Sequence, residues 1–473
     1  MRSVLCSVVR SLSYIALVVN GASGQEPPDT LKQMAHVDAD IVRAGQALQA
    51  VWPGFRFSEY GLAYVVPDRG KLVARWPSPL PDFHSLAEGL RHQWTDTLTL
   101  SWDPSLPVAA LSVVSGGTRA GVAGLALHEA FHAYQRSRRH EGRRFGRGEN
   151  SLLTVRYPLF DVQHEALFAV EAGLLERAVH APDLAEAHRL ARQFLAVRAR
   201  RQRSIDSALV SYENLAELNE GLAQYVLVKG LEVLASHNAD YRRGAVEERE
   251  IERRFLQNPL AFTDLSPRRR AYAAGSYLGL LLDRLAGDRW KQDVVRDDRY
   301  LGDLLHEIVG TDTVASSVAA EIARALITAG ESVDRLAKTR AVQRDTILSG
   351  EIRIVLDPTL AERFSWCGFD PQNLLTTAQG EILHMRMLNL CHKGKRVAVL
   401  EQPAVEEPGS GRVLTSLRNG AFTLRVGGNA IDPLEEPGGY FSQRVQLYGE
   451  YIDVDIASAD VLISGTAIVI MPR

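Results

Sequence analysis

The sequence of 473 residues has few cysteines, no long apolar run and little excess charge. Its apolar runs are too short to cross a bilayer, so we expect no membrane span. The formal net charge of −3 argues against general nucleic-acid binding. With 46% apolar and 23% charged residues, the composition is that of an ordinary globular protein with a sizeable core.

Residues 1–24 have the features of an export signal. Two arginines provide a positive end, a short apolar run follows at 14–19, and small residues at 22–24 offer a cleavage site. The residues before Cys6 do not form a lipid-attachment motif. We therefore expect removal of residues 1–24 and a secreted or periplasmic protein.

Two cysteines, Cys367 and Cys391, follow this signal. In an oxidising compartment they would form one disulfide, whereas two buried thiols are the alternative. The sequence leaves both open.

The pattern of apolar residues divides the rest of the chain into three parts and predicts an α+β multidomain protein. Residues 25–117 mix a helix with short extended segments, and residues 118–344 follow the 3.6-residue period of helices. Residues 345–473 alternate with period two between turn residues, which is typical of a small sandwich or barrel. The extended segments expected in the first part are 55–57, 62–66, 71–76, 98–102 and 108–114. The helices expected in the second part are 121–139, 160–180, 184–203, 207–235, 245–256 and 267–285, with two more before Arg344.

The last of these extended segments, 108–114, leads through a turn at 115–118 into the next helix. A small sheet in this place would form one wall of a peptide cleft. Its unpaired edge would accept an extended substrate as an added strand.

That next helix contains the segment LALHEAFHAY at 125–134. His128 and His132 are four residues apart, so their rings point from one helix face and can bind one cation. Glu129 can serve as the base for a bound water. The motif is that of a zinc metallopeptidase on a buried helix, and an amphipathic helix with two polar residues on its outer face is the alternative.

A catalytic zinc site needs a third protein ligand and leaves a fourth position to water. HEAFH followed by Leu-Asn-Glu-Gly-Leu-Ala-Gln-Tyr at 218–225 resembles the gluzincin metallopeptidases, the thermolysin-like and membrane-alanyl-aminopeptidase-like enzymes. The resemblance implies that zinc is bound by His128, His132 and Glu220. It also implies that Glu129 is the general base. It covers the two motif helices and hardly any of the C-terminal half.

Glu220 lies much further from the HExxH motif than the corresponding glutamate of the aminopeptidases. The interval holds two extra predicted helices, 160–180 and 184–203. Such an insertion is tolerable because the entropy of loop closure grows only logarithmically with length. An insertion of this size can also reshape the cleft, so the resemblance does not define the substrate.

Two other glutamates are candidates for roles at the site. Glu171, in the helix that contains His164 and Glu165, is an alternative ligand or a surface residue. Glu217 precedes Glu220 by one helical turn on the same face. It would accept a hydrogen bond from a zinc-bound histidine, or it is exposed to solvent.

The tetrahedral oxygen of a peptidase reaction needs a hydrogen-bond donor besides the metal. In the gluzincins a tyrosine or histidine from a later helix often supplies it. Tyr272 and Tyr277 are the candidates in this chain, and packing in the core is the alternative for both.

Six arginines between positions 136 and 147 follow the HExxH helix. A solvated loop with cations at a helix end is one interpretation. A rim that attracts acidic substrates is the other.

These features predict an exported zinc peptidase that acts on peptides or proteins, with neither a nucleic-acid partner nor a membrane span. A binding protein that keeps the fold without activity is one alternative. A zinc hydrolase of a non-peptide amide or ester is another, since this chemistry does not require a peptide. We find no confident counterpart of the acidic amine-binding motif of the aminopeptidases, so endo- and exopeptidase action both stay open, as does the oligomeric state.

Overall fold

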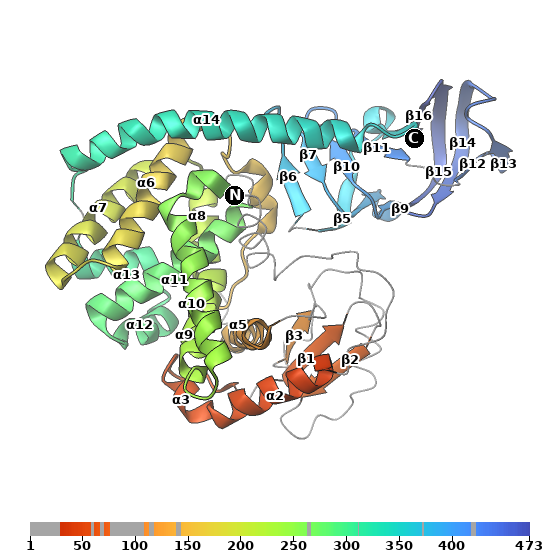
Figure 1. Ribbon diagram of the computed structural model, residues 1–473. Coiled ribbons are helices and arrows are strands. Elements are labelled where there is room, and N and C mark those ends of the chain that lie inside the picture. Colours follow the sequence, from red (N-terminus) through yellow and green to blue (C-terminus); the bar gives the residue numbers. More distant parts are fainter. Residues whose placement is uncertain are drawn as a thin grey trace. The chain divides into compact units, whose positions relative to one another are not determined.

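Figure 1 shows the protein as a computed structural model. It describes residues 29–57, 61–66, 71–75, 108–112, 118–138, 143–262, 266–310, 312–370, 373–417 and 422–473. The signal expected at 1–24 and the strand expected at 98–102 lie outside these residues. Compactness divides the chain into one unit of 1–150 with 162–329 and a second of 151–161 with 330–473. Among the described helices, none has the length and apolar character needed to cross a membrane.

The first unit begins with two helices, α2 (Asp29–Arg43) and α3 (Gly45–Gln49). The prediction of a strand at 55–57 is wrong, because the chain forms a turn at these residues. The N–H of Phe55 donates to the carbonyl oxygen of Trp52 (3.1 Å), and Gly54 has a φ of +77°. Phe55 is buried with its ring 5.4 Å from that of Phe131. The Phe-Arg-Phe alternation therefore reflects rings that a turn directs into the core.

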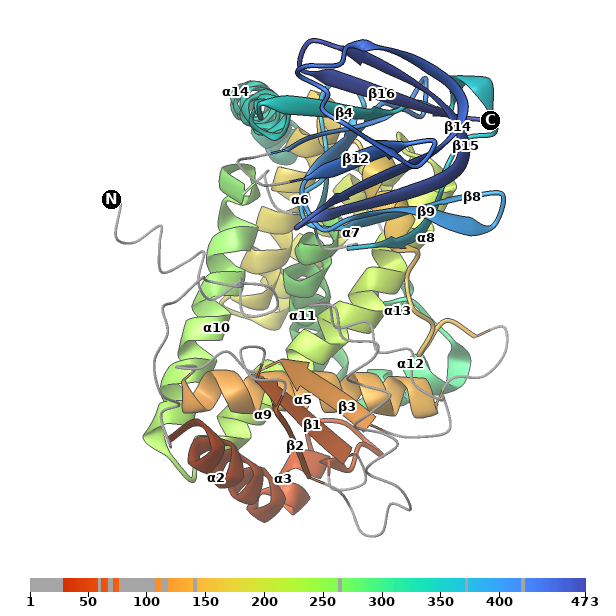
Figure 2. The same ribbon diagram turned by 90° about the vertical axis from the view of Figure 1, so that its right-hand side faces the viewer.

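A small sheet follows. β1 (Gly61–Val66) pairs antiparallel with β2 (Lys71–Arg75) and parallel with β3 (Val108–Ser112). The strands predicted at 62–66 and 71–76 are confirmed, as is the part of the strand predicted at 108–114 that the structure describes, 108–112. The order β2-β1-β3 puts β3 at one edge of the described sheet. Figures 1 and 2 both show β3 beside the helix α5 (Arg119–Ser137), which it contacts.

The helix α5 begins at Thr118, whose hydroxyl oxygen accepts a hydrogen bond from the N–H of Gly121 (3.0 Å). This cap satisfies one of the free donors at the helix start. Buried residues line α5 along most of its length, so the helix passes through the core. Both motif histidines are therefore held on a rigid element.

Helices dominate the rest of the first unit, as the periodicity predicted. The segment expected as one helix at 207–235 is continuous, but its middle is a wider π-turn, η4. Three helices instead of two follow α11 in the described chain. The elements are α6 (Val162–Val179), α7 (Leu184–Gln202), α8 (Ser207–Ala216), η4 (Glu217–Gly221), α9 (Leu222–Leu234), α10 (Ala239–Gln257), η5 (Pro259–Phe262), α11 (Pro267–Ala286), α12 (Arg289–Asp297), α13 (Leu301–Val309) and α14 (Ser316–Ile347), which contains the boundary between the units.

One hydrophobic core joins the N-terminal helices to the later ones. The Trp52 ring lies 5.0 Å from Phe131 of α5, 6.4 Å from Tyr225 of α9 and 5.4 Å from Trp290 of α12. The boundary expected at 117 therefore does not separate two cores, because residues on both of its sides pack together.

A buried carboxyl group on α10 makes the stability of this unit depend on pH. Burial first, and then the nearby charge of Glu248, raise the pKa of Glu252 to about 8. The Ser276 hydroxyl donates a hydrogen bond to Glu252 (3.1 Å). In the unfolded chain a glutamate has a pKa of about 4.3. The stabilisation is thus complete below about pH 4 and is lost as the pH rises through the folded pKa.

We expect Glu252→Gln to reduce the fall in thermal stability of the metal-free protein between about pH 5 and 8. The amide carries no charge at any of these pH values, so it removes this linked proton. Glu247→Gln, the same change at an exposed position of α10, is the control. Parallel stability curves for the wild type and Glu252→Gln would exclude this origin of the pH dependence.

The second unit is rich in strands, which confirms the predicted change from helices to strands. Its described strands form a sheet that curls into a half-barrel, as Figure 2 shows. The strand order is β13-β12-β14-β15-β16-β4-β11-β10-β7-β6, and β9, β8 and β5 branch from β15. The strands are β4 (Ile352–Leu356), β5 (Ser365–Phe369), β6 (Leu374–Thr376), β7 (Ile382–His384), β8 (Leu388–His392), β9 (Lys395–Leu400), β10 (Ala404–Glu406), β11 (Val413–Leu417), β12 (Thr423–Val426), β13 (Asn429–Ile431), β14 (Gly438–Gly449), β15 (Ile452–Ser464) and β16 (Ala467–Pro472). Short helices at Ser151–Arg156 and Pro358–Leu360 complete the unit.

The first and last strands of this sheet region, β4 and β16, pair in parallel, whereas most neighbours are antiparallel. Alternate residues of β4, β15 and β16 point into one apolar core. Cys367 of β5 and Cys391 of β8 form a disulfide with Cα atoms 5.7 Å apart. Of the two predictions for these cysteines, the structure has the disulfide.

Candidate metal centre

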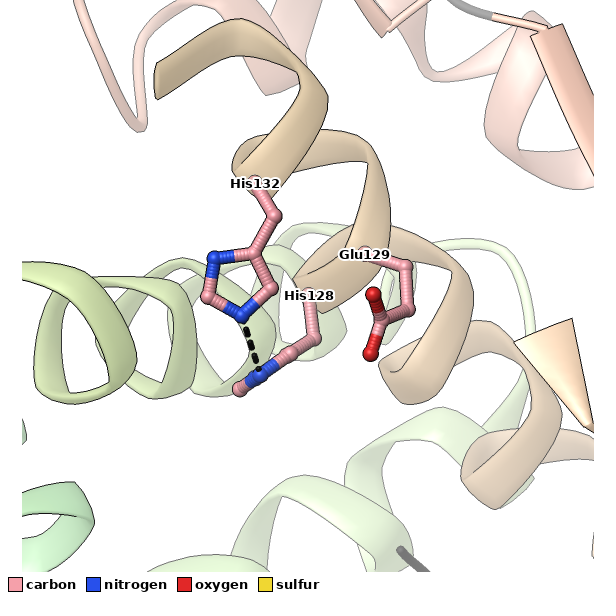
Figure 3. A group of neighbouring side chains, drawn as sticks. All are labelled: His128, Glu129 and His132. Atoms are coloured by element: carbon pink, nitrogen blue, oxygen red, sulfur yellow. Dashed lines mark hydrogen bonds between the residues drawn. The ribbon is translucent and has the colours of Figure 1, made fainter. Parts of the chain in front are cut away.

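The two histidines of the HExxH motif converge from α5, as Figure 3 shows. Their Nε2 atoms are 3.1 Å apart. Glu220, from the π-turn η4, places its Oε2 atom 3.5 Å from Nε2 of His128 and 3.4 Å from Nε2 of His132. The structure thus brings together the three residues that the resemblance implied as ligands.

The spacing of these three donor atoms fits a metal ion. A tetrahedron with metal–ligand distances of about 2.0–2.2 Å has edges of about 3.3–3.6 Å. The three observed separations, 3.1 to 3.5 Å, are close to such edges. The Oε2 atom of Glu220 is buried and makes no hydrogen bond in the described structure. Two imidazoles with one carboxylate form a donor set that suits zinc and leaves a fourth vertex for water.

Charge neighbours determine the ionisation of these groups. Burial raises the pKa of Glu220, but the positive charges of Arg268 and His132 outweigh burial and hold this pKa well below its ordinary value. Burial lowers the pKa of His132, but the charge of Glu220 outweighs it and raises this pKa to about 9. Without a metal, His132 is therefore a cation beside an ionised Glu220, and a bound metal ion would replace the His132 proton.

Glu129 lies beside the two histidines rather than between them (Figure 3). One oxygen of its carboxylate and one ring nitrogen of each histidine all lie within 4.8 Å of one another. Glu129 is half-buried, whereas His128 is only 1% exposed. Glu129 therefore lies close enough to both histidines for these three residues to hold one cation, next to the triangle formed with Glu220.

Gln135 holds His132 in one orientation. Its Oε1 atom lies 2.9 Å from Nδ1 of His132, and its amide nitrogen donates to the carbonyl oxygens of Leu218 (2.8 Å) and Asn219 (3.2 Å). Since an amide oxygen only accepts, Nδ1 of His132 carries a proton, and Nε2 is the ring nitrogen that would bind a metal once its own proton is lost. The same side chain links α5 to η4, the element that carries Glu220.

The sequence made Glu217 the candidate to accept a hydrogen bond from a zinc-bound histidine. In the structure Glu217 bonds to an arginine instead. Its carboxylate accepts a hydrogen bond from Arg198 (2.6 Å), and the side chain is buried rather than solvent-exposed. Nδ1 of His128 makes no hydrogen bond among the described residues. The sequence did contain a signal for Gln135, because it lies three residues after His132 and so on the same helix face.

Glu171, the alternative ligand, is also occupied elsewhere. Its carboxylate forms ion pairs with Arg201 (2.6 Å) and Arg198 (3.4 Å) in the interior between α6 and α7. It is therefore part of a buried ion network and not of the histidine site. Of the two glutamates considered as third ligand, only Glu220 contacts the histidines.

The two tyrosines proposed as donors separate in the structure. Tyr272, on α11, stacks on His128 with ring centroids 5.7 Å apart and ring planes 8° from parallel. Burial, and after it the charge of Glu220, raise the Tyr272 pKa well above its ordinary value, so the hydroxyl keeps its proton. Tyr277 is 1% exposed and packs against His180, on another face of the same helix. The structure thus brings Tyr272 to the site and leaves Tyr277 in the core.

Arg268 is a site residue that the sequence analysis missed. Its guanidinium donates to Oε1 of Glu220 (2.5 Å) and to the hydroxyl of Tyr272 (3.2 Å), and it also bonds to Glu149. Asn219 donates to the same Oε1 atom (3.1 Å) and to Glu149 (2.9 Å). These bonds occupy Oε1 of Glu220 and leave Oε2 for the histidine side. The sequence could have indicated Arg268, because it lies four residues before Tyr272 and so on the same face of the helix.

Two glycines allow α11 to approach η4 closely. A Cβ atom on Gly221 would lie 2.4 Å from Cα of Gly275 and 2.8 Å from the carbonyl oxygen of Ala271. These are backbone atoms, so the neighbour cannot rotate away. The contact brings Tyr272 and Arg268 next to Glu220, and only glycine fits there.

We expect Gly221→Ala to lower stability by about 1–3 kcal/mol and to weaken metal binding, because the added methyl separates the two backbones. Gly173→Ala is the control, since a Cβ atom at this α6 position meets nothing within 4 Å. Thermal unfolding and zinc titration of both variants provide the measurement. Wild-type affinity in Gly221→Ala would show that the close contact does not position Glu220.

The described members of the basic run mainly anchor the chain after α5. The Arg144 guanidinium lies 4.1 Å from the Tyr300 ring centroid and donates to the carbonyl oxygen of Asp298 (3.2 Å). Arg138 lies over the Tyr134 ring at 5.4 Å. Arg138 and Arg144 thus fit the interpretation as helix-end and loop cations. Arg136 lies nearer the candidate site, since burial lowers its pKa while the charges of Glu129 and Glu220 oppose that shift.

No family model matches the chain, and neither a curated protein nor a solved structure matches it. The likeness to the gluzincins rests on the two sequence motifs alone. The chemistry of the site therefore follows from its own donor atoms and their surroundings.

Proposed function

We propose that the protein is a zinc-dependent hydrolase that cleaves peptide bonds. The observation that carries this proposal is the triangle of donor atoms from His128, His132 and Glu220, with sides of 3.1 to 3.5 Å. A His-His-Glu set with an open vertex and an adjacent carboxylate is the arrangement of catalytic rather than structural zinc. Zinc in this place would supply a Lewis acid for the substrate carbonyl and lower the pKa of a bound water.

Glu129 has the role of general base in this proposal. Its carboxylate takes a proton from the attacking water and passes it to the leaving amine. Its position beside the triangle supports the role, because the carboxylate lies close to both histidines. Gln135 keeps the His132 ring in the orientation that this geometry requires.

Tyr272 is the proposed donor to the oxyanion of the tetrahedral state. Its hydroxyl keeps its proton, and the stacking on His128 holds the ring beside the metal position. Arg268, bonded to both the hydroxyl and Glu220, fixes the position of this donor. Preorganised donors of this kind contribute several kcal/mol to transition-state stabilisation.

The edge strand β3 supports a peptide as the substrate. It packs beside α5, and among the described strands it pairs with β1 alone, so its other side is where an extended chain would add. A peptide bound there would run along the helix that carries Glu129. We include in this proposal that the helical unit with β1 to β3 has a zincin-like fold.

Export from the cytoplasm belongs to the same proposal. The disulfide between Cys367 and Cys391 supports it, because disulfides persist in oxidising compartments. The basic and apolar character of residues 1–24 supports it independently. A secreted or periplasmic peptidase is therefore the localisation we propose.

Metal analysis of the purified protein, followed by digestion of a broad peptide library, tests the function. We expect one zinc per chain and cleavage that stops on addition of a chelator and returns with zinc. Zinc without cleavage of any peptide, but with hydrolysis of simple esters or amides, would favour the non-peptide hydrolase. Absence of both zinc and turnover would leave an inactive binding protein.

A further inference from the structure

The π-turn η4 separates the directions of two glutamates that a regular helix would place together. In an α-helix of 3.6 residues per turn, Glu217 and Glu220 are three apart and share one face. The π-turn at 217–221 includes both residues. Its hydrogen bonds join residues five apart, so the chain turns through a smaller angle per residue than in an α-helix. Glu217 consequently faces Arg198, while Glu220 faces the histidines.

A buried ion network contacts this turn through Glu217, on a different face from that of Glu220. Arg198 of α7 donates to Glu217 (2.6 Å) and to Asn214 (3.0 Å). Its side chain is 4% exposed, and that of Glu217 is 7% exposed. Neighbouring bonds of Arg201 extend the network to α6 and α8 through Glu171 and Glu213.

The network comes from the helices that lengthen the interval between the two motifs. Both arginines lie on α7, and Glu171 lies on α6. The insertion therefore reaches the helix that carries the third metal donor.

We propose that Arg198 is a positioning residue for the metal centre: its ion pair with Glu217 holds the π-turn that aims Glu220 at His128 and His132. This inference rests on the proposed zinc site. A buried ion pair is weak evidence for a stabilising role, because desolvation offsets much of the attraction. Its effect here is directional, since one guanidinium nitrogen, Nη2 of Arg198, donates to both Asn214 and Glu217 and holds them on one side of the helix.

Zinc affinity tests the proposal without reference to turnover. The full chain is stripped of metal, and the zinc dissociation constant is measured by competition with a chromophoric chelator. We expect Arg198→Met to weaken zinc binding by about 10- to 100-fold, as loss of partners behind metal ligands does. Arg198→Lys keeps the charge and one bond, and should recover most of the affinity.

Arg284→Met is the matched control. Arg284 of α11 donates to the carbonyl oxygens of Val179 (2.7 Å) and Ala181 (2.5 Å), so the variant also loses two hydrogen bonds between helices. Neither of these bonds involves η4. The zinc affinity of Arg284→Met should therefore equal that of the wild type. An equal loss of affinity in Arg284→Met and Arg198→Met would overturn the proposal, because destabilisation alone would then explain both.

Failure of Arg198→Met to fold does not end the test. The double variant Arg198→Met with Glu217→Met replaces the buried pair by apolar side chains, which often restores stability. It should fold and still bind zinc weakly. Wild-type affinity in the double variant overturns this inference and leaves the proposed function standing, whereas absence of zinc binding in the wild type refutes the proposed function itself.

Discussion

Glu129→Gln is expected to lower kcat for peptide hydrolysis by about 10²- to 10⁴-fold, the usual contribution of a general base. The amide has the same shape but cannot take the proton of the attacking water. Zinc content should stay at one per chain, because Glu129 is not part of the donor triangle. Metal analysis and steady-state kinetics on the same preparation would measure both effects.

The matched control for this change is Glu247→Gln, the same substitution at an exposed position of α10. It should have wild-type turnover and zinc content. Retention of activity in Glu129→Gln would mean that another group activates the water. Loss of zinc together with activity would instead place Glu129 among the ligands.

Glu220→Ala is expected to weaken zinc binding by more than about 100-fold, since loss of a ligand should exceed the 10- to 100-fold cost of losing a partner behind one. Removal of Glu220 leaves two imidazoles and no protein carboxylate in the triangle. It also takes away one of the acceptors of Arg268, which keeps its hydrogen bonds to Glu149 and Tyr272. A competition titration with a chelator measures the affinity, and thermal unfolding without metal shows whether the variant is folded.

Glu220→Gln separates the ligand role from the packing role. The single amide oxygen can accept from Arg268, which keeps the side chain in place but puts the amide nitrogen at the Oε2 position, where it cannot bind zinc. A loss of affinity close to that of Glu220→Ala, with the fold preserved, is expected. If Glu220→Ala binds zinc as the wild type does, the triangle is not the metal site, whatever its spacing.

The residues of the HExxH helix could be placed from the sequence because their arrangement is local. Thr118 caps α5, and the separation of four residues puts His128 and His132 on one face in any α-helix. Glu129 follows from the same periodicity. The change from helices to strands near position 345 was equally readable, because the repeat of apolar residues differs between the two.

Partners from different helices could not be derived in this way. Gln135 and Glu217 each had an accessible signal, but their roles depend on which helix packs next to them. The π-turn at 217–221 directs Glu217 toward Arg198. Nothing in the local sequence pattern indicates that the helix widens to a π-turn at this place. The strand expected at 55–57 failed for a related reason, since the burial of its rings depends on α5.

Which donor atoms the chain carries, and the helix face from which two of them point, follow from the order of its residues. That Glu220 rather than Glu171 meets them, and that Tyr272 rather than Tyr277 lies beside them, depends on how the helices pack. Periodicity specifies a direction around one helix axis, whereas the meeting of two helices depends on packing. Here that packing is the glycine contact between η4 and α11 and the ion network of α7, which bring distant parts of the chain to one point.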